Sequence, residues 1–280
     1  MTDRGDFVSI EIDRHRLSIE YQWLGEGLED SPEEGYKPLV VFLHEGLGSR
    51  AMWKDFPARL CHACGCRGLV YSRPGYGRST AREVDQHWQP NFMHAQAHRV
   101  LPALFKALGI DTALHPPLLF GHSDGGSIAL LYAARFPRQV AGLILLAPHI
   151  LVEDISIASI KLARKAYLDT DLKQKLGRYH ENVDSAFWGW NDIWLSPAFR
   201  DWSIEDELVK IRCPILAVQG VDDAYGTLEQ IHGIARRVAQ TEIIALKNCG
   251  HSPHRDQGER LIERSVRFMQ NQRLTGPQSV

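Results

Sequence analysis

The chain has 280 residues, of which 44% are hydrophobic and 24% charged, which is the composition of an ordinary globular protein. Its 32 Lys and Arg residues against 34 Asp and Glu residues give a formal charge of −2, so no overall positive field attracts nucleic acid or an anionic membrane surface. We therefore expect neither nucleic acid nor a membrane as a partner.

The N-terminus and the cysteine content indicate a cytoplasmic protein. Met1–Asp6 carries acids, and no apolar segment of the kind found in secretory signals follows it. The longest apolar stretches fall far short of the ~20 residues that cross a membrane. Five cysteines, an odd number, argue against a secreted disulfide framework. Cys61, Cys64 and Cys66 lie close together without a second cluster to complete four ligands, so we predict core thiols and no metal.

The predicted elements begin with two half-buried strands. Around Val8–Ile12 and Leu17–Trp23, apolar and polar residues alternate as in antiparallel strands. Gly25–Lys37 is rich in Gly, Glu, Asp and Pro and is predicted to be an exposed loop. Short runs that are apolar on both faces then predict buried strands at Leu39–Leu43, Leu69–Tyr71, Leu118–Phe120, Leu143–Leu146, Ile215–Val218 and Ile243–Leu246.

Stretches with the period of a helix lie between the buried strands, at Ala51–Cys61, Gln96–Leu108, Ser127–Phe136, Leu228–Val238 and Glu259–Met269. This alternation predicts an α/β fold with a mostly parallel central sheet flanked by helices. It breaks after residue 150, where two charged helical patterns precede the aromatic stretch Phe187–Trp194. We predict a core domain of residues 1–150 and 206–280, and a helical insertion of residues 151–205.

The segment that starts at Gly121 reads Gly-His-Ser-Asp-Gly and lies between a predicted strand and a predicted helix. At such a junction the turn is sharp enough to strain the serine backbone and to present its hydroxyl at the edge of the sheet. Ser123 is therefore a candidate nucleophile, next to helical N–H groups that stabilise negative charge. The alternative is an ordinary helix cap at Ser123 or Asp124.

A serine nucleophile needs a histidine to take its proton and a carboxylate to orient that histidine. Asp222 and Asp223 follow the predicted strand at Ile215–Val218, and His251 and His254 follow the last predicted strand. The order serine, aspartate, histidine, together with the Gly-x-Ser-x-Gly junction, resembles that of the α/β-hydrolase superfamily. The resemblance covers nearly the whole chain.

This resemblance implies which acid and which histidine act. In the family, the acid commonly lies three residues beyond a glycine that closes the penultimate strand. Gly220 therefore implies Asp223, and Asp222 becomes a turn residue. The histidine of the family follows a glycine after the last strand, which matches His251, while His254 is the competing candidate.

The loop after the first parallel strand extends the resemblance. It reads His-Glu-Gly-Leu-Gly from His44, similar to the His-Gly-x-Pro-Gly oxyanion loop of the superfamily, with Glu45 for glycine and Leu47 for proline. The resemblance implies that the backbone N–H groups of Gly46 and Asp124 bind the oxyanion, with Leu47 as the next candidate donor. It also implies that His44 is structural.

Two further patterns carry less chemistry. The turn that starts at Ser72 resembles the Asp-x-x-Gly-x-Gly-x-Ser turn of the superfamily, with serine in place of the acid, and supports the fold. His94 and His98 lie one helical turn apart, but no third ligand accompanies them in a recognised pattern. We expect an ordinary helix face there, and we predict no metal and no cofactor.

In the superfamily, an insertion at this place is a helical cap over the nucleophile. The tryptophans of the insertion either form the core of the cap or face the pocket and select an apolar or aromatic substrate. Trp188 and Trp190 are candidate substrate contacts for this reason. Leu47 and His149 are further candidates, and His149 is equally compatible with the junction between cap and core.

The sequence thus predicts a serine hydrolase of small apolar or aromatic carboxylic esters or related acyl compounds, acting through an acyl-enzyme on a small-molecule substrate. Two alternatives stay open. One is a carbon–carbon bond hydrolase of a ring-fission diketone, an activity of some relatives with this cap. The other is a non-catalytic ligand-binding protein, which competent residue types at every expected position disfavour. The sequence is also compatible with a homo-oligomer.

Overall fold

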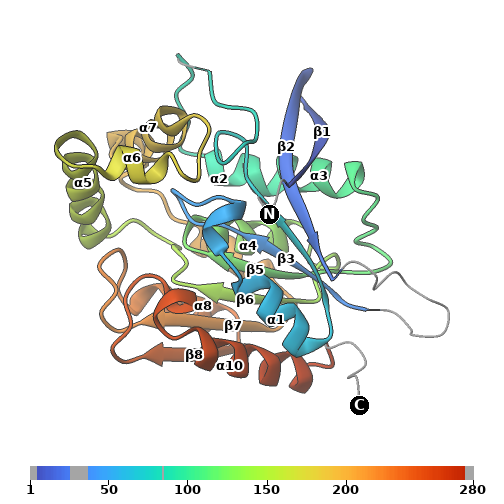
Figure 1. Cartoon of the computed structure of the whole chain (residues 1–280). Coiled ribbons are helices and arrows are strands. Elements are labelled where there is room, and N and C mark those ends of the chain that lie inside the picture. The colour runs from blue at the N-terminus through green and yellow to red at the C-terminus, as the bar shows by residue number, and fades with distance from the viewer. Residues whose placement is uncertain (1–4, 26–36, 84, 275–280) are drawn as a thin grey trace.

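A computed structural model of the chain describes residues 5–25, 37–83 and 85–274. In this described part the strands form an eight-stranded sheet in the order β1-β2-β4-β3-β5-β6-β7-β8 (Figure 1). The strands are β1 (Asp6–Ile12), β2 (His15–Leu24), β3 (Leu39–Leu43), β4 (Arg67–Tyr71), β5 (Leu118–His122), β6 (Gly142–Leu146), β7 (Ile215–Gly220) and β8 (Thr241–Leu246). The predicted loop at Gly25–Lys37 falls on residues 26–36, which lie outside the described residues.

The sheet is antiparallel at its N-terminal edge and parallel elsewhere. β2 pairs antiparallel with β1 and β4, and the remaining neighbours pair in parallel. In β3, Val40 and Phe42 face one hydrophobic core, while Val41 and Leu43 face the other. Burial on both faces explains why the central strands are continuously apolar in the sequence.

Helices cover both faces of the sheet, as the sequence predicts. One face carries α1 (Phe56–Cys64) and α10 (Gly258–Asn271), which pack side by side (Figure 1). The other face carries a segment of three helical pieces together with α4 (Asp124–Arg135) and α8 (Glu229–Arg237). The three pieces are α2 (Phe92–Ala95), η2 (Gln96–Val100) and α3 (Leu101–Ala107).

Two helices differ from their predicted bounds. The stretch predicted as one helix at Ala51–Cys61 is a 3₁₀ turn, η1 (Arg50–Trp53), followed by α1. Lys54 separates them with a φ of 57°, which no helix continues through. The helix predicted to begin at Gln96 begins at Phe92, and its middle, η2, widens into a π-helical turn just before Pro102, which has no N–H to donate.

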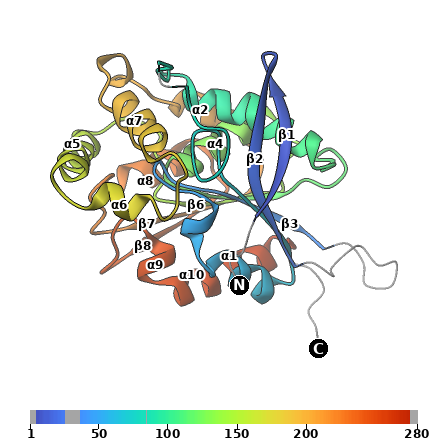
Figure 2. The ribbon, with the colours of Figure 1, turned by 45° about the horizontal axis from the view of Figure 1, so that its top comes forward.

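The segment between β6 and β7 is helical. It contains α5 (Asp154–Asp169), α6 (Leu172–Leu176) and α7 (Val183–Trp194), and returns to the sheet through η3 (Pro197–Phe199) and η4 (Glu205–Lys210). Figures 1 and 2 show α5, α6 and α7 grouped on one side of the molecule, away from α1 and α10. We call these three helices the cap. Asn182 begins α7 by accepting a hydrogen bond from the backbone N–H of Ser185.

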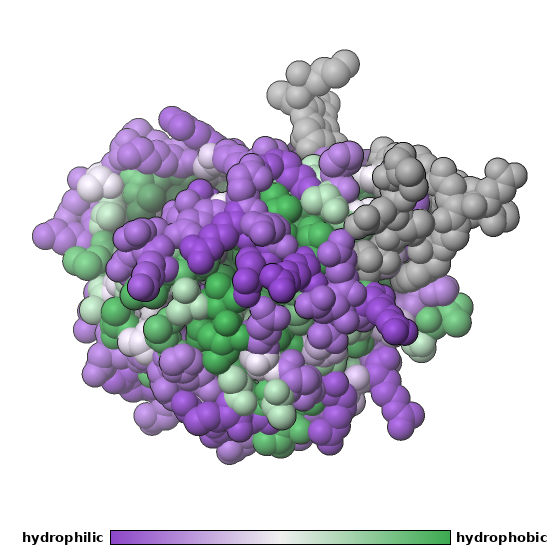
Figure 3. Space-filling model, turned by 90° about the horizontal axis from the view of Figure 1, so that it is seen from below, coloured by the Kyte–Doolittle hydropathy of each residue, from purple (hydrophilic) through white to green (hydrophobic). Residues whose placement is uncertain are grey.

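Seen from below, hydrophilic residues cover most of the molecule, with hydrophobic ones between them (Figure 3). Within the described part of the chain, no helix is long and apolar enough to cross a membrane.

All five cysteines are buried, and Cys61, Cys64 and Cys66 pack between the sheet and the helices α1 and α10. Burial raises the pKa of Cys213 and of Cys249 to about 12. Among the described residues, no group of three or more His, Cys, Asp or Glu side chains is arranged to hold a metal ion.

Candidate active site

The connection from β5 to α4 is a sharp elbow at Ser123. Ser123 has a φ of 53° and a ψ of −121°, a strained conformation for a residue with a side chain. A Cβ on Gly121 would overlap the backbone of Gly125, and a Cβ on Gly125 would overlap the carbonyl group of Leu43. The backbone N–H of Ser123 donates to the carbonyl oxygen of Leu146 at 2.8 Å. The glycines and this bond hold the hydroxyl of Ser123 at the carboxyl edge of the sheet.

Ser123, His251 and Asp223 form a continuous hydrogen-bonded line. The Oγ of Ser123 lies 3.0 Å from Nε2 of His251, and Nδ1 of His251 lies 2.9 Å from each carboxylate oxygen of Asp223. The backbone N–H of Tyr225 and the side chain of Gln219 also donate to Asp223, each at 2.8 Å. Burial alone raises the pKa of Asp223, but its contacts with His251 outweigh burial and lower it overall.

The competing residues lie elsewhere. Asp222 is exposed at the turn after β7. His254 is buried in an aromatic cluster, with its ring 4.9 Å from those of Trp53 and His122 and 5.8 Å from that of Phe56. Burial lowers the pKa of His254 to about 3, so the side chain is neutral. The structure therefore places Asp223 and His251, and not Asp222 or His254, beside Ser123.

Gly46 and Asp124 flank Ser123, where the sequence predicts the oxyanion site. Gly46 belongs to the loop after β3, and Asp124 is the first residue of α4. Both line one pocket together with Ser123 and Leu47. A Cβ on Gly46 would overlap the indole ring of Trp190, so the cap packs directly on this loop.

His44 holds the shape of that loop. Its Nδ1 lies 2.7 Å from the carbonyl oxygen of Glu45 and donates to it, while Nε2 accepts the backbone N–H of Arg73 at 3.0 Å. Burial holds its pKa well below the ordinary value. His44 is thus the structural residue that the resemblance implied.

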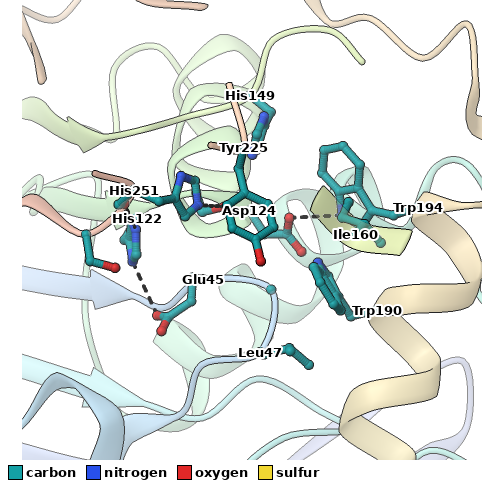
Figure 4. A pocket seen from close by; sticks show the side chains of 13 residues that line it. Glu45, Leu47, His122, Asp124, His149, Ile160, Trp190, Trp194, Tyr225 and His251 are labelled. Atoms are coloured by element: carbon teal, nitrogen blue, oxygen red, sulfur yellow. Dashed lines mark hydrogen bonds and ion pairs between the residues drawn. The ribbon is translucent and has the colours of Figure 1, made fainter. Parts of the chain in front are cut away.

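Two contacts between polar side chains lie beneath the pocket. Arg73, fully buried, lies 3.7 Å from Oδ2 of Asp124. Glu45 lies 3.4 Å from Nδ1 of His122, whose Nε2 donates to the backbone carbonyl of His251 at 2.7 Å (Figure 4). Burial raises the pKa of Glu45, but its contact with His122 and the nearby Arg255, 3.5 Å away, outweigh burial and lower it, so Glu45 is ionised. His122 therefore connects the loop after β3 to the loop that carries His251.

The cap forms the opposite wall of the pocket. The space contains about 510 Å³, part of it open to solvent. Figure 4 shows the side chains that surround it. The described residues of the lining are apolar, aromatic, histidine, serine and acidic, with no Lys or Arg among them: Glu45, Gly46, Leu47, His122, Ser123, Asp124, His149, Ile160, Trp190, Trp194, Tyr225, His251 and Ser252.

Three of the four predicted substrate contacts line this pocket, namely Leu47, His149 and Trp190. Trp188, the fourth, does not line this pocket, because its ring lies on another side of α7, against Tyr167 and Phe187. His149 stands edge-on to Trp194, and burial lowers its pKa to about 3. Both the pocket and the junction between cap and core thus involve His149.

The sequence analysis did not identify some of the residues that line the pocket. Tyr225 lies two residues after Asp223, in the loop that follows β7. This position after the end of a strand could have identified it as a lining residue. Ile160 comes from the middle of α5, where nothing in the sequence marks it. His94 pairs with Glu207 at 2.7 Å on an ordinary helix surface, as expected.

The turn that starts at Ser72 has serine in place of the acid of the superfamily, and a glutamate from another strand supplies the carboxylate. Glu20, on β2, is buried and accepts hydrogen bonds from Oγ of Ser72 at 2.8 Å and from the backbone N–H of Arg78 at 3.0 Å. It also pairs with Arg50 at 3.3 Å. The sequence did not predict this role of Glu20.

Comparisons with known proteins agree with this architecture. The model of the Alpha/beta hydrolase family matches residues 40–264. A 2-hydroxy-6-oxo-6-phenylhexa-2,4-dienoate hydrolase of Burkholderia cepacia is 24% identical over 266 residues, which cover 85% of this chain and 90% of that protein. A bifunctional esterase/perhydrolase of Acinetobacter calcoaceticus is 27% identical over 217 residues, or 66% of this chain and 74% of that protein. An esterase structure from Thermogutta terrifontis shares the fold, with a TM-score of 0.70 and 20% identity over 96% of this chain and 98% of that one.

Proposed function

The chain belongs to the alpha/beta hydrolase family, and we propose that it is a serine hydrolase of neutral carboxylic esters with small apolar or aromatic groups. The observation that carries this proposal is the line from Ser123 through His251 to Asp223, with separations of 3.0 Å and 2.9 Å. These are the separations over which a histidine takes a proton from a serine while a carboxylate orients the ring.

In the proposed first half-reaction, Oγ of Ser123 attacks the ester carbonyl carbon while Nε2 of His251 takes the hydroxyl proton. The carbonyl oxygen becomes an oxyanion between the backbone N–H groups of Gly46 and Asp124. His251 then returns the proton to the leaving oxygen, the carbon–oxygen bond breaks, and the acyl group stays on Ser123. Asp223 stabilises the charged ring throughout.

In the second half-reaction, water replaces the alcohol. His251 takes a proton from the water, whose oxygen attacks the acyl carbon, and the same two N–H groups bind the new oxyanion. When this intermediate collapses, Ser123 recovers its proton and the acid leaves. Each step uses side chains and backbone N–H groups of the chain itself, and water.

The pocket lining supports a neutral substrate. Ile160, Trp190 and Trp194 supply apolar walls next to Ser123. The ionised Glu45 lies in the same lining, and none of the described lining residues is Lys or Arg. Arg255 pairs with Glu45 at 3.5 Å, but a substrate carboxylate placed here would find no cation among the described lining residues to pair with, which is costly in a partly buried site.

A carbon–carbon bond hydrolase is the second candidate, because the Burkholderia cepacia relative aligns over 85% of this chain. The name of that relative specifies a dienoate, which carries a carboxylate. Because the described lining residues include Glu45 but no Lys or Arg, the pocket favours the neutral ester over such a substrate.

The first experiment measures intact mass after incubation with a small fluorophosphonate, for the wild type and for Ser123→Ala in parallel. The proposal expects one adduct on the wild type and none on the variant, because the reagent reports an activated serine. A folded wild type that forms no adduct would contradict it and favour the non-catalytic ligand-binding alternative.

The second experiment compares turnover of p-nitrophenyl butyrate, of an equally sized p-nitrophenyl ester that ends in a carboxylate, and of a 2-hydroxy-6-oxo-dienoate. We expect the neutral ester to have the highest kcat/KM. Faster bleaching of the dienoate would overturn the ester assignment in favour of the second candidate. In either case Ser123→Ala should lose about 10⁴-fold or more of kcat.

A further inference from the structure

Helix α7 brings two indole N–H groups to the pocket from one face. Trp190 and Trp194 are four residues apart, which places them on the same side of the helix, and both line the pocket. Nε1 of Trp194 donates to Oδ1 of Asp124 at 3.2 Å. This bond holds α7 against the first residue of α4, directly after Ser123.

The second indole lies against the loop after β3. A Cβ on Gly46 would overlap Nε1 and Cδ1 of Trp190, so the nitrogen edge of the ring packs on this residue. The backbone of Gly46 is not in the left-handed region, and the indole ring is therefore the reason for glycine here. Figure 4 shows the ring of Trp190 with its nitrogen towards the middle of the pocket.

Within the described part of the chain, Nε1 of Trp190 has no hydrogen-bond acceptor. Trp53 and Trp202 also lack one, but their nitrogens are shut off from solvent in the interior, whereas Trp190 lines the pocket. An indole nitrogen only donates, and a donor left without an acceptor in a substrate-filled pocket is costly. We therefore expect an atom of the substrate to accept this hydrogen bond.

We propose that Nε1–H of Trp190 donates a hydrogen bond to the acyl oxygen of the substrate, as a third oxyanion donor supplied by the cap. This inference rests on the proposed serine hydrolase function. The two backbone donors, from Gly46 and Asp124, border the same space. An oxyanion is a stronger acceptor than a carbonyl oxygen, so the bond strengthens as the reaction proceeds.

The charges around the site make a further donor valuable. The side chains of Asp124 and Glu45 place carboxylates beside the space where the oxyanion forms. Arg73 lies 3.7 Å from Asp124 but is fully buried behind it and does not line the pocket. Trp190 adds a neutral N–H donor on the substrate side.

The test compares Trp190→Phe with Trp202→Phe. Each substitution removes an indole N–H and keeps an aromatic ring, but Trp202 lies outside the pocket lining. We expect Trp190→Phe to lower kcat for p-nitrophenyl butyrate about 10- to 100-fold with little change in KM, and Trp202→Phe to change kcat less than 3-fold. Equal kcat values for Trp190→Phe and the wild type would overturn the proposal.

A sulfur-for-oxygen substrate separates this role from a structural one. The matching thionoester places a sulfur, a weaker acceptor, where the acyl oxygen stands. Because both substrates are measured on the same sample, any misfolded fraction cancels. We expect the loss caused by Trp190→Phe to be at least 5-fold smaller for the thionoester than for the oxoester. Equal losses would overturn the proposal and show that Trp190 only shapes the pocket.

Failure of the proposed function gives a different result. A wild type that neither reacts with the fluorophosphonate nor hydrolyses the ester overturns the function, and this inference with it. A wild type that does both, with Trp190→Phe unchanged in kcat, overturns only the role of Trp190.

Discussion

Trp194 donates its indole N–H to Asp124 across 3.2 Å, which ties the cap to the residue directly after Ser123. The carboxylate that receives this bond is fully buried and also lies 3.7 Å from Arg73. A displacement of α7 would therefore leave a buried carboxylate with one partner fewer. The position of the cap and the shape of the candidate oxyanion site are coupled through this one side chain.

Trp194→Phe should lower the free energy of unfolding by about 1.5–3 kcal/mol, because it removes a hydrogen bond to a buried carboxylate. Urea unfolding followed by circular dichroism measures this. Trp202→Phe is the matched control, since the buried Nε1 of Trp202 has no acceptor to lose among the described residues. Equal losses in the two variants would assign the effect to ring packing instead.

Asp223→Asn should lower kcat about 10⁴-fold for the preferred ester with little change in KM, because an amide no longer holds His251 in the orientation that receives the serine proton. Asp222→Asn is the control and should keep kcat near the wild-type value, since Asp222 is exposed at the turn. Steady-state kinetics of the two variants check this. The reverse result would identify Asp222 as the residue that orients His251.

The buried His254 should lower the stability of the folded chain as the pH falls into the mildly acidic range. Burial lowers its pKa to about 3 in the folded chain, whereas an unfolded histidine titrates near about 6.5. The unfolded state thus binds the proton first, and the contribution of neutral His254 is complete above about pH 6.5 and is lost as the pH falls towards 3. Between pH 7 and 4.5, Tm of His254→Phe should fall less than Tm of the wild type.

The exposed His232 provides the control for that measurement. His232→Phe should keep the wild-type slope of Tm against pH. If both variants flattened the slope equally, the acid sensitivity would not come from the burial of His254.

Glu20→Gln should cost about 3–5 kcal/mol of unfolding free energy, because it breaks a buried ion pair with Arg50 and weakens the hydrogen bonds from the turn at Ser72. Glu11→Gln, on the exposed face of β1, should change it by less than about 0.5 kcal/mol. Adding Ser72→Asp to Glu20→Gln should restore part of the loss, since it returns a carboxylate to the turn. Thermal unfolding of the three variants tests this, and no recovery in the double variant would speak against a shared role of the two positions.

The sequence was most informative where a local pattern decides the structure. Continuous apolar runs predicted the central strands, because burial on both faces leaves no alternation, and the junction at Ser123 followed from its glycines. The orientation of α7 was beyond such patterns, since the sequence permits either Trp188 or Trp190 to face the pocket. Packing of the indole on Gly46 decides it. Glu20 was missed because its partner Ser72 is 52 residues away in the chain.

Because the five cysteines are buried, the reaction of their thiols with an added reagent would report the unfolding of the chain. With every thiol inside the fold, a thiol reagent should find no reactive group until the core opens. The rate at which Ellman's reagent reacts would then measure how often the fold opens, and no label has to be attached to the protein. Cys61 and Cys64 on α1 would report on one face of the sheet, and Cys213, in the core of the other face, would report on the second.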